Sequence, residues 1–246
     1  MDRLVYTAMT GARHILDQQA TTSNNLANAT TTGFRAQLDT FRAVPVMSEG
    51  LPTRAFVVDS TVGADMRAGP IQTTGRNLDV ALRGEGWIAV QSADGSEAYT
   101  RNGSLRVNQN GLLETTSGQL LQGDGGPIAI PPETNVAIGG DGTVSSISTD
   151  YKPGPSNVLG RIKLVNPDPK SLIRGDDGLF RVAAGTVAEA DPAVRLVDGA
   201  LEGSNVNPVD SMVSMITLAR QFETQMSLLK NAENNAAKAT QILALN

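Results

Sequence analysis

The C-terminal segment places the strongest constraint on the fold. From residue 208 to about residue 244 it follows a helical pattern that no glycine or proline interrupts after Pro208. Asn207 can cap this helix, Pro208 suits the first helical position, and Asp210 lies in the first turn. At 1.5 Å per residue the helix would be about 55 Å long, well beyond the typical helix of a globular domain. Its seam recurs at spacings of three and four and consists of Met212, Met215, Ala219, Phe222, Met226, Leu229, Glu233, Ala236, Thr240 and Leu243.

The N-terminal segment repeats this spacing over a predicted helix from about residue 3 to about residue 28. Both seams are narrow, so neither helix buries much apolar surface by folding alone. Two arrangements fit the spacing equally well. The helices pack on each other or on the middle of the chain, or helices of other copies complete a coiled coil. The N-terminal seam is apolar in its first half and consists of Val5, Met9, Ala12, Leu16, Gln19, Ser23 and Leu26.

The middle of the chain, roughly residues 70–204, is typical of β structure. Asp-Gly and Asn-Gly pairs, which favour hairpin turns with positive φ, recur between residues 94 and 199. Short runs of β-branched or alternating residues separate them, such as those at 87–90 and 161–165. Several short strands at this spacing predict an antiparallel sandwich or an irregular barrel.

Composition excludes several classes of protein. The formal net charge of −5 argues against a nucleic-acid-binding protein, which normally presents a basic face. The absence of cysteine excludes disulfides, thiol catalysis and zinc–thiolate sites. No stretch approaches the roughly 20 apolar residues that cross a bilayer, and polar residues interrupt the N-terminus where a cleavable signal needs an apolar region. We expect no nucleic-acid partner, no membrane insertion and no cleaved signal peptide.

Residues that could carry catalysis are few and isolated. His14 is the one histidine, so it cannot form a histidine-based triad or a multi-histidine zinc site. The pair Asp176 and Asp177 could serve glycoside hydrolysis, but turn chemistry before the following glycine accounts for it. A faint calcium-loop pattern at 106–117 fails because Ser117 stands where the bidentate acid should be. We predict no enzyme, no catalytic, metal-binding or cofactor-binding residue, and no small-molecule substrate.

Several motifs resemble those of the bacterial flagellar rod and hook proteins. SNNLANATTTGFRAQ at 23–37 resembles the N-terminal signature of that family, and LEGSNVNPVDSMVSMITLARQFE at 201–223 resembles its C-terminal signature. NLDVALRGEGWIAV and YTRNG, at 77–90 and 99–103, look like its central β motif. The resemblance covers most of the chain in the expected order.

Within this family the chain most resembles a proximal rod protein, through its opening MDRLVYTAM, RAVPV at 42–46 and Trp87. The resemblance implies a structural subunit that the flagellar type III export apparatus delivers without a cleaved signal. Such subunits assemble helically, with copies of themselves and with other rod proteins, into the axial drive shaft in the periplasm. The shaft transmits torque and forms the export channel. The alternatives are a distal rod or hook-type subunit within the family, and a secreted β-rich binding protein or a glycan hydrolase outside it.

The resemblance also decides between the two helix arrangements. We therefore predict an α+β fold class, in which the N- and C-terminal helices pair as a coiled-coil-like domain. The central domain is predicted to be all β, as an antiparallel sandwich or irregular barrel. The predicted boundaries are residues 1–36 with 205–246 for the helical domain, 37–69 for an extended connector, and 70–204 for the β domain.

The same resemblance points to candidate residues for contacts between subunits. We expect the apolar seams to pack both within a subunit and between subunits. Gly33 is expected to stop the first helix at a positive φ, and the asparagine amides to bond the backbone of neighbouring subunits. The predicted interface residues are Met9, Leu16, Asn24, Asn25, Leu26, Asn28, Gly33, Phe34, Arg35, Asn205, Met215, Phe222, Met226 and Leu229.

Overall fold

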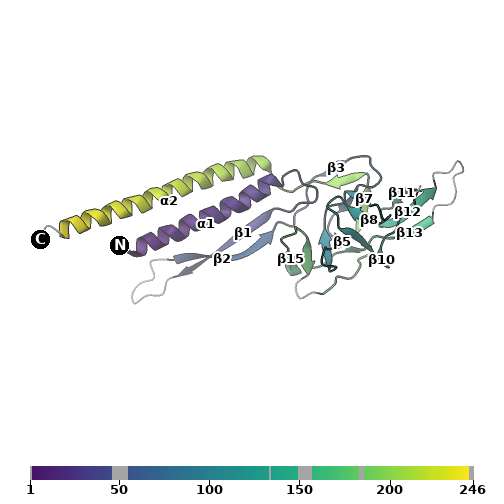
Figure 1. Cartoon of the computed structure of the whole chain (residues 1–246), viewed down its shortest axis with the longest axis horizontal. Coiled ribbons are helices and arrows are strands. Elements are labelled where there is room, and N and C mark those ends of the chain that lie inside the picture. Colours follow the sequence, from purple (N-terminus) through teal and green to yellow (C-terminus); the bar gives the residue numbers. More distant parts are fainter. Residues whose placement is uncertain (1, 46–54, 133, 149–156, 183–185, 244–246) are drawn as a thin grey trace. The chain divides into compact units, whose positions relative to one another are not determined.

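The structure, a computed structural model, describes residues 2–45, 55–132, 134–148, 157–182 and 186–243. The chain forms two units, and Figure 1 labels many of their elements. The helical unit comprises residues 1–29, 36–65 and 206–246, and the β unit comprises residues 30–35 and 66–205. The chain therefore passes from one unit to the other after residues 29, 35, 65 and 205.

Two helices occupy the ends of the chain, and this confirms the prediction from spacing. Helix α1 spans Asp2–Ala27 and helix α2 spans Pro208–Leu243. They pack side by side in opposite directions, with both chain termini at the same end of the pair (Figure 1). The predicted cap is also confirmed, because the Asn207 Oδ1 accepts a hydrogen bond from the Val209 amide at 3.0 Å. None of the described helices is long and apolar enough to cross a membrane.

A β-hairpin completes the helical unit. Strands β1 (Gln37–Pro45) and β2 (Ala55–Ala64) pair antiparallel, and their register shifts between Thr40 and Phe41. Both strands contact α1, and the Phe41 ring meets the His14 ring edge-on with 5.5 Å between their centroids. The sequence predicts an extended connector for this segment. β-Branched and aromatic residues are frequent in both strands, which favours the paired, extended backbone that the structure has.

On both helices, every second buried or half-buried position lies one residue before the predicted seam. On α2, Met215, Phe222 and Leu229 are half-buried as predicted, whereas Met212 and Met226 are exposed. The half-buried positions recur at spacings of four and three, so they share one face of the helix. They are Ser211, Met215, Leu218, Phe222, Gln225, Leu229 and Ala232.

Helix α1 shows the same offset. Ala12 and Ile15 are buried, whereas Met9 and Leu16 of the predicted seam are exposed. The side chain of Val5 lies outside the described residues. Polar residues take several contact positions in both helices, so the faces that meet carry fewer apolar side chains than the predicted seams.

The β unit consists of short antiparallel strands. They are β3 (Ile71–Thr73), β4 (Val80–Arg83), β5 (Trp87–Gln91), β6 (Glu97–Thr100), β7 (Leu105–Val107), β8 (Leu113–Thr115), β9 (Leu120–Gly123), β10 (Gly126–Pro127), β11 (Thr134–Ile138), β12 (Thr143–Ser148), β13 (Asn157–Arg161), β14 (Leu164–Val165), β15 (Leu172–Arg174), β16 (Phe180–Val182), β17 (Arg195–Asp198) and β18 (Ala200–Glu202). A short 3₁₀ helix at Pro169–Ser171 precedes β15.

These strands form several sheets. The largest has nine strands, in the order β15-β16-β6-β5-β9-β8-β7, with β10 paired to β9 and β14 paired to β5. Strands β11, β12 and β13 form a second sheet, and the pairs β17–β4 and β18–β3 form two more. The last pair places Glu202, at the end of β18, opposite Ile71.

The predicted fold class is wrong and is corrected as follows. The two helices do pack on each other, but they form no coiled-coil-like domain of their own, because the β1–β2 hairpin also packs on α1 and because polar residues interrupt their contact face. The centre of the chain is mostly β, as several antiparallel sheets rather than the predicted sandwich or barrel. The sequence pattern predicted strands and turns, but it could not predict the sheet to which each strand belongs.

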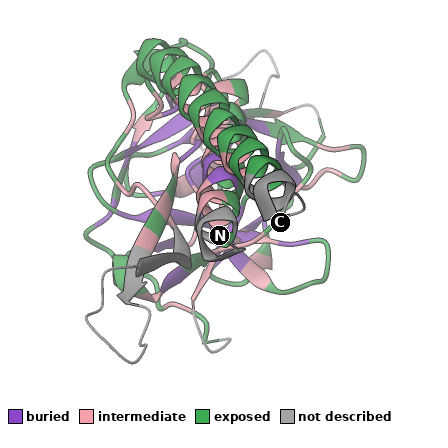
Figure 2. Cartoon of the chain, turned by 90° about the vertical axis from the view of Figure 1, so that its left-hand side faces the viewer, coloured by how far each residue is buried: buried purple, intermediate pink, exposed green. Residues whose placement is uncertain are grey.

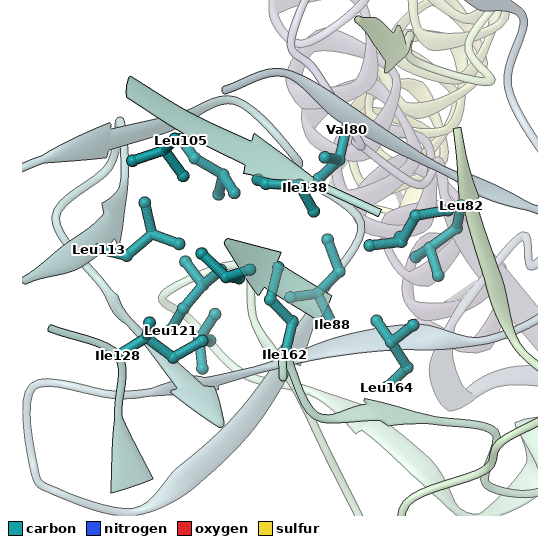
Figure 3. Packing of buried hydrophobic residues seen from close by; sticks show 14 of the residues in the cluster. Val80, Leu82, Ile88, Leu105, Leu113, Leu121, Ile128, Ile138, Ile162 and Leu164 are labelled. Carbon is teal, nitrogen blue, oxygen red and sulfur yellow. The ribbon is translucent and has the colours of Figure 1, made fainter. Parts of the chain in front are cut away.

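One apolar core holds the β unit together (Figure 3). Aliphatic side chains from the nine-stranded sheet meet others from β4, β11 and β12, and Val80, Ile88, Leu105 and Leu121 are completely buried. Burying one such side chain stabilises a fold by about 1.5–3 kcal/mol. Hairpin turns connect the strands, and the glycines at 95, 111, 142, 178 and 199 have the predicted positive φ.

Candidate subunit interface

The outward face of α2 carries a row of large apolar side chains. Val209, Met212, Val213 and Ile216 are between 52% and 65% exposed. Their spacing places them on one side of the helix, away from most of the half-buried face that meets α1, and Val213 also lines the groove between α1, α2 and β1. Figure 2 shows that most of α2 is exposed along its length. We call these four residues the α2 stripe. Contiguous exposed apolar surface of this kind marks an interaction site.

Helix α1 carries a matching row. Tyr6, Met9 and Leu16 are between 48% and 60% exposed, and Arg13 lies among them, also exposed. The spacing again places all four on one helix face, away from the buried Ala12 and Ile15. We call Tyr6, Met9, Arg13 and Leu16 the α1 stripe. Within the single chain, both helices therefore present apolar side chains to solvent.

The structure divides the apolar residues of the predicted interface into two groups. Met9, Leu16 and Met226 are exposed and therefore accessible to another subunit. The others, which are Leu26, Met215, Phe222 and Leu229, are half-buried within the helical unit. Contact of either group with another subunit stays a prediction.

The predicted asparagines have partners within the chain. The Asn25 amide bonds the backbone of Gln37 in both directions: its Nδ2 donates to the carbonyl oxygen at 2.9 Å, and its Oδ1 accepts from the amide at 2.8 Å. This pair of bonds ties α1 to the start of β1. The Asn28 Nδ2 donates to the Asn24 carbonyl at 2.9 Å, where the helix ends. Asn24 itself is exposed, and bonds from these amides to another subunit stay a prediction.

Gly33 lies in a close contact that only glycine permits. Its φ of 69° is in the left-handed region, as predicted for the stop after α1. Its amide donates to the Glu202 carbonyl at 2.8 Å, which brings residues 30–35 against β18. A Cβ at this position would lie 2.4 Å from the Arg101 carbonyl carbon and 2.4 Å from the Asn102 nitrogen. The glycine therefore serves both the backbone conformation and the close packing.

Arg35 and Glu202 form a buried ion pair next to this contact. Arg35 Nη2 lies 2.7 Å from Glu202 Oε1, and both side chains are at most 1% exposed. A second arginine joins them, because Arg101 Nη1 lies 2.9 Å from Glu202 Oε2. Burial lowers the pKa of the Arg101 guanidinium, while the Glu202 charge opposes that shift. Glu202 Oε1 also accepts a hydrogen bond from the Gly69 amide at 2.9 Å.

Phe34 and Asn205 complete this cluster. The Phe34 ring is buried and lies 4.5 Å from the Arg174 guanidinium carbon, and Arg174 Nη1 donates to the Arg35 carbonyl at 3.0 Å. The Asn205 amide donates to the Phe34 carbonyl at 3.3 Å, and its Nδ2 donates to the Arg67 carbonyl at 3.0 Å. We call residues 33–35, 67–69, 101 and 202–205 the junction. Their contacts join the segments at which the chain enters and leaves the β unit.

Sequence reasoning missed the residues at the centre of the junction. Glu202 lies within the C-terminal motif, but its partners are Arg101, which precedes it by 101 residues, and Arg35, which precedes it by 167 residues. No local spacing in the sequence reveals such contacts. Val209, Val213 and Ile216 were missed for a different reason. Their spacing of three and four is visible in the sequence, but it competes with the neighbouring seam, and only the packing shows which face is outward.

A shallow groove of about 380 Å³ lies between α1, α2 and β1 in the helical unit. Thr21, Asn25, Asp39 and Thr217 are among its lining residues, and the Thr21 hydroxyl donates to Asp39 Oδ1 at 2.9 Å. Asn25 is bonded to Gln37.

Hydrogen bonds within the β unit account for Asp177, one of the residues considered for catalysis. Asp177 accepts hydrogen bonds from the Leu179 amide at 3.1 Å and from Arg181 Nη2 at 2.7 Å. The hydrogen bond from Arg181 holds the pKa of the Asp177 carboxyl below its usual value, which does not suit a general acid. Among the described residues, no group of three or more His, Asp or Glu side chains is placed to hold a metal ion.

Three family models match the chain. They are those of the flagella basal body rod protein over residues 5–35, of the flagellar hook protein FlgE/F/G D1 domain over 81–146, and of the flagellar basal body rod FlgEFG protein C-terminal region over 197–242. The first covers the α1 stripe and Arg35, and the last covers Glu202 and the α2 stripe. The matches thus include both exposed stripes and the buried ion pair.

The chain is 49% identical to flagellar basal-body rod protein FlgF of Escherichia coli, and the alignment covers 100% of both chains. The chain belongs to the flagellar basal-body rod protein family. FlgF of Caulobacter vibrioides is 33% identical over 99% of this chain and 98% of that protein. Flagellar basal-body rod protein FlgG of Bacillus subtilis is 28% identical over 95% of this chain and 96% of that protein. The family resemblance seen in the terminal motifs is thereby confirmed.

Proposed function

We propose that this protein is a structural subunit of the flagellar basal-body rod, assembling helically with its own copies and with other rod proteins. The exposed stripes on α1 and α2 are the structural observation that supports this function most directly. A monomer that works alone gains nothing from large apolar side chains held in water on two helices. A subunit of a filament needs such surfaces, because a contact between two different faces repeats from copy to copy.

The proposal extends to where the subunit acts and how it arrives there. The rod lies in the periplasmic part of the basal body, surrounds the export channel and transmits torque as a rigid shaft. The flagellar type III export apparatus delivers the subunit without cleavage of a signal peptide. Support for these finer points comes from the two terminal signatures through the family that they resemble, and the relatives are themselves flagellar basal-body rod proteins. The higher identity to FlgF than to FlgG among the relatives described favours a proximal rod subunit over a distal one.

Complementation tests this function. We expect the chain, expressed in Escherichia coli cells that lack FlgF, to restore swimming in soft agar, because the two proteins align over their full lengths. Empty vector is the negative control, and Escherichia coli FlgF is the positive control. If the cells secrete the chain but do not recover swimming, the result contradicts the proposal.

Met226→Glu separates assembly from folding. Met226 is 48% exposed, so the added charge should leave the helical and β units of the free chain intact. A charge buried without a partner in a contact between subunits costs several kcal/mol, and each 1.4 kcal/mol weakens binding about tenfold. We therefore expect assembly to weaken by about two orders of magnitude, measured as loss of swimming and of subunit in purified basal bodies. Gln221→Glu is the control, because it adds the same charge at an exposed position on another side of α2. Equal loss of assembly with both variants would contradict a specific role for Met226.

A further inference from the structure

We infer that one copy of this chain contacts the next through the two stripes, with the α1 stripe lying antiparallel on the α2 stripe of its neighbour. The inference rests on the proposed function as a rod subunit and names the surfaces that would meet. Both stripes are exposed in the single chain and are accessible to a second copy, although Val213 also lines the groove between α1, α2 and β1.

The first part of the α1 stripe matches the α2 stripe in spacing and in apolar character, whereas Leu16 lies beyond the start of α2 in this alignment. Tyr6 and Met9 are one helical turn apart, and so are Ile216 and Val213 on α2. When the helices run antiparallel with Met9 against Val213, Tyr6 lies against Ile216 and Met212 flanks the contact. All of these side chains are at least half exposed in the single chain and become buried together. A polar partner surface could not remove them from water in this way.

Charge complementarity fixes the register. Arg13 is the one charged residue of the α1 stripe, and it lies one turn beyond Met9. Asp210 is exposed in the first turn of α2, about one turn before Val213. In the antiparallel pairing of Met9 with Val213, these two residues come to the same level, and the long Arg13 side chain reaches the carboxylate. Register and charge therefore agree on one alignment of the two helices.

This alignment differs from the one within a single chain. There, the Gly11 backbone lies against the Gln225 side chain, so Met9 is level with Ser227. Moving Met9 from Ser227 to Val213 displaces the neighbouring copy by fourteen residues along α2, or about 21 Å. Because the contact joins two different surfaces, each copy keeps one stripe open for another neighbour. Such a contact builds a polar filament when the rotation between copies does not close a ring.

Cysteine cross-linking tests the alignment, because the natural chain contains no cysteine. Two differently tagged copies are expressed together in Escherichia coli cells that lack FlgF, one carrying Met9→Cys and the other Val213→Cys. After mild oxidation, a mixed dimer with both tags can form only between copies. The matched control pairs Met9→Cys with Ser227→Cys, which places the second cysteine at the level that the intrachain alignment would give. Swimming of the same cells reports separately on the rod function.

We expect swimming cells in which the Met9–Val213 pair gives at least about tenfold more mixed dimer than the Met9–Ser227 pair. Arg13→Glu should reduce that dimer, and Asp210→Arg in the partner copy should restore it, whereas Glu223→Arg should not. Swimming cells with no mixed dimer, with equal dimer from both pairs, or with more from Met9–Ser227 overturn the inference and leave the rod function standing. Cells in which the chain without cysteine substitutions fails to restore swimming overturn the rod function, and the inference with it.

Discussion

Gly33→Ala is expected to destabilise the β unit by roughly 2–5 kcal/mol, the sum of two separate penalties. The φ of 69° places an alanine in the left-handed region, which costs about 1–2 kcal/mol. The new Cβ would also lie 2.4 Å from backbone atoms of Arg101 and Asn102, so those segments must move apart. Backbone cannot rotate away as a flexible side chain can, and overpacking of this kind costs about 1–3 kcal/mol.

Gly75→Ala is the matched control for this prediction. Gly75 has nearly the same φ, 72°, but a Cβ there would meet no atom within 4 Å. We expect it to lose only the conformational term. Urea unfolding followed by tryptophan fluorescence measures both variants, because Trp87 is the one tryptophan and is buried against Phe180 in the β unit. If both variants lose the same unfolding free energy, the close approach at Gly33 adds no overpacking cost to the substitution.

Glu202→Gln is expected to have the second large effect, about 3–5 kcal/mol of lost stability. The amide has nearly the shape of the carboxylate, so the substitution removes charge more than packing. It removes the counter-charge that the buried guanidinium groups of Arg35 and Arg101 share. The hydrogen bond from the Gly33 amide is unaffected, because it uses the Glu202 backbone carbonyl. Removing one partner of a buried charge cluster is costly because the remaining charges stay desolvated.

Asp177→Asn provides the comparison for Glu202→Gln. It breaks the Asp177–Arg181 ion pair by the same acid-to-amide change, but both of those side chains are about one-third exposed. Exposed ion pairs contribute about 0–1 kcal/mol, because water screens them and already solvates both groups. The same fluorescence measurement applies to both variants. If the Glu202→Gln protein unfolds at the same urea concentration as the Asp177→Asn protein, the Glu202 charge does not stabilise the junction more than an exposed ion pair would.

Loss of the Glu202 charge is also expected to affect assembly. The junction holds residues 33–35 and 202–205, from which the chain continues toward the hairpin of the helical unit and into α2. Loosening it is expected to reduce rod formation as well as stability of the β unit. Measuring swimming with Glu202→Gln alongside its unfolding separates these effects, because Met226→Glu is expected to lose swimming at unchanged unfolding free energy.

Local patterns in the sequence determined much of this protein. The bounds of α1 and α2 follow from periodicity, the Asn207 cap and Pro208, all of which act within a few residues. The positive φ of Gly33 follows from turn chemistry in the same way. The terminal motifs indicated the family, which the full-length relatives confirm. These features were predictable because the interactions that produce them are short in sequence.

Tertiary structure alone decided the rest. Met226 is exposed, whereas its neighbour Gln225 lies against Gly11. Periodicity in the sequence does not resolve which of two adjacent residues faces the other helix. The junction depends on contacts such as Arg101–Glu202 and Gly69–Glu202, whose partners lie 101 and 133 residues apart. The amino-acid sequence specifies those contacts only through the folding of the whole chain, because burial, not spacing, selects which charges meet.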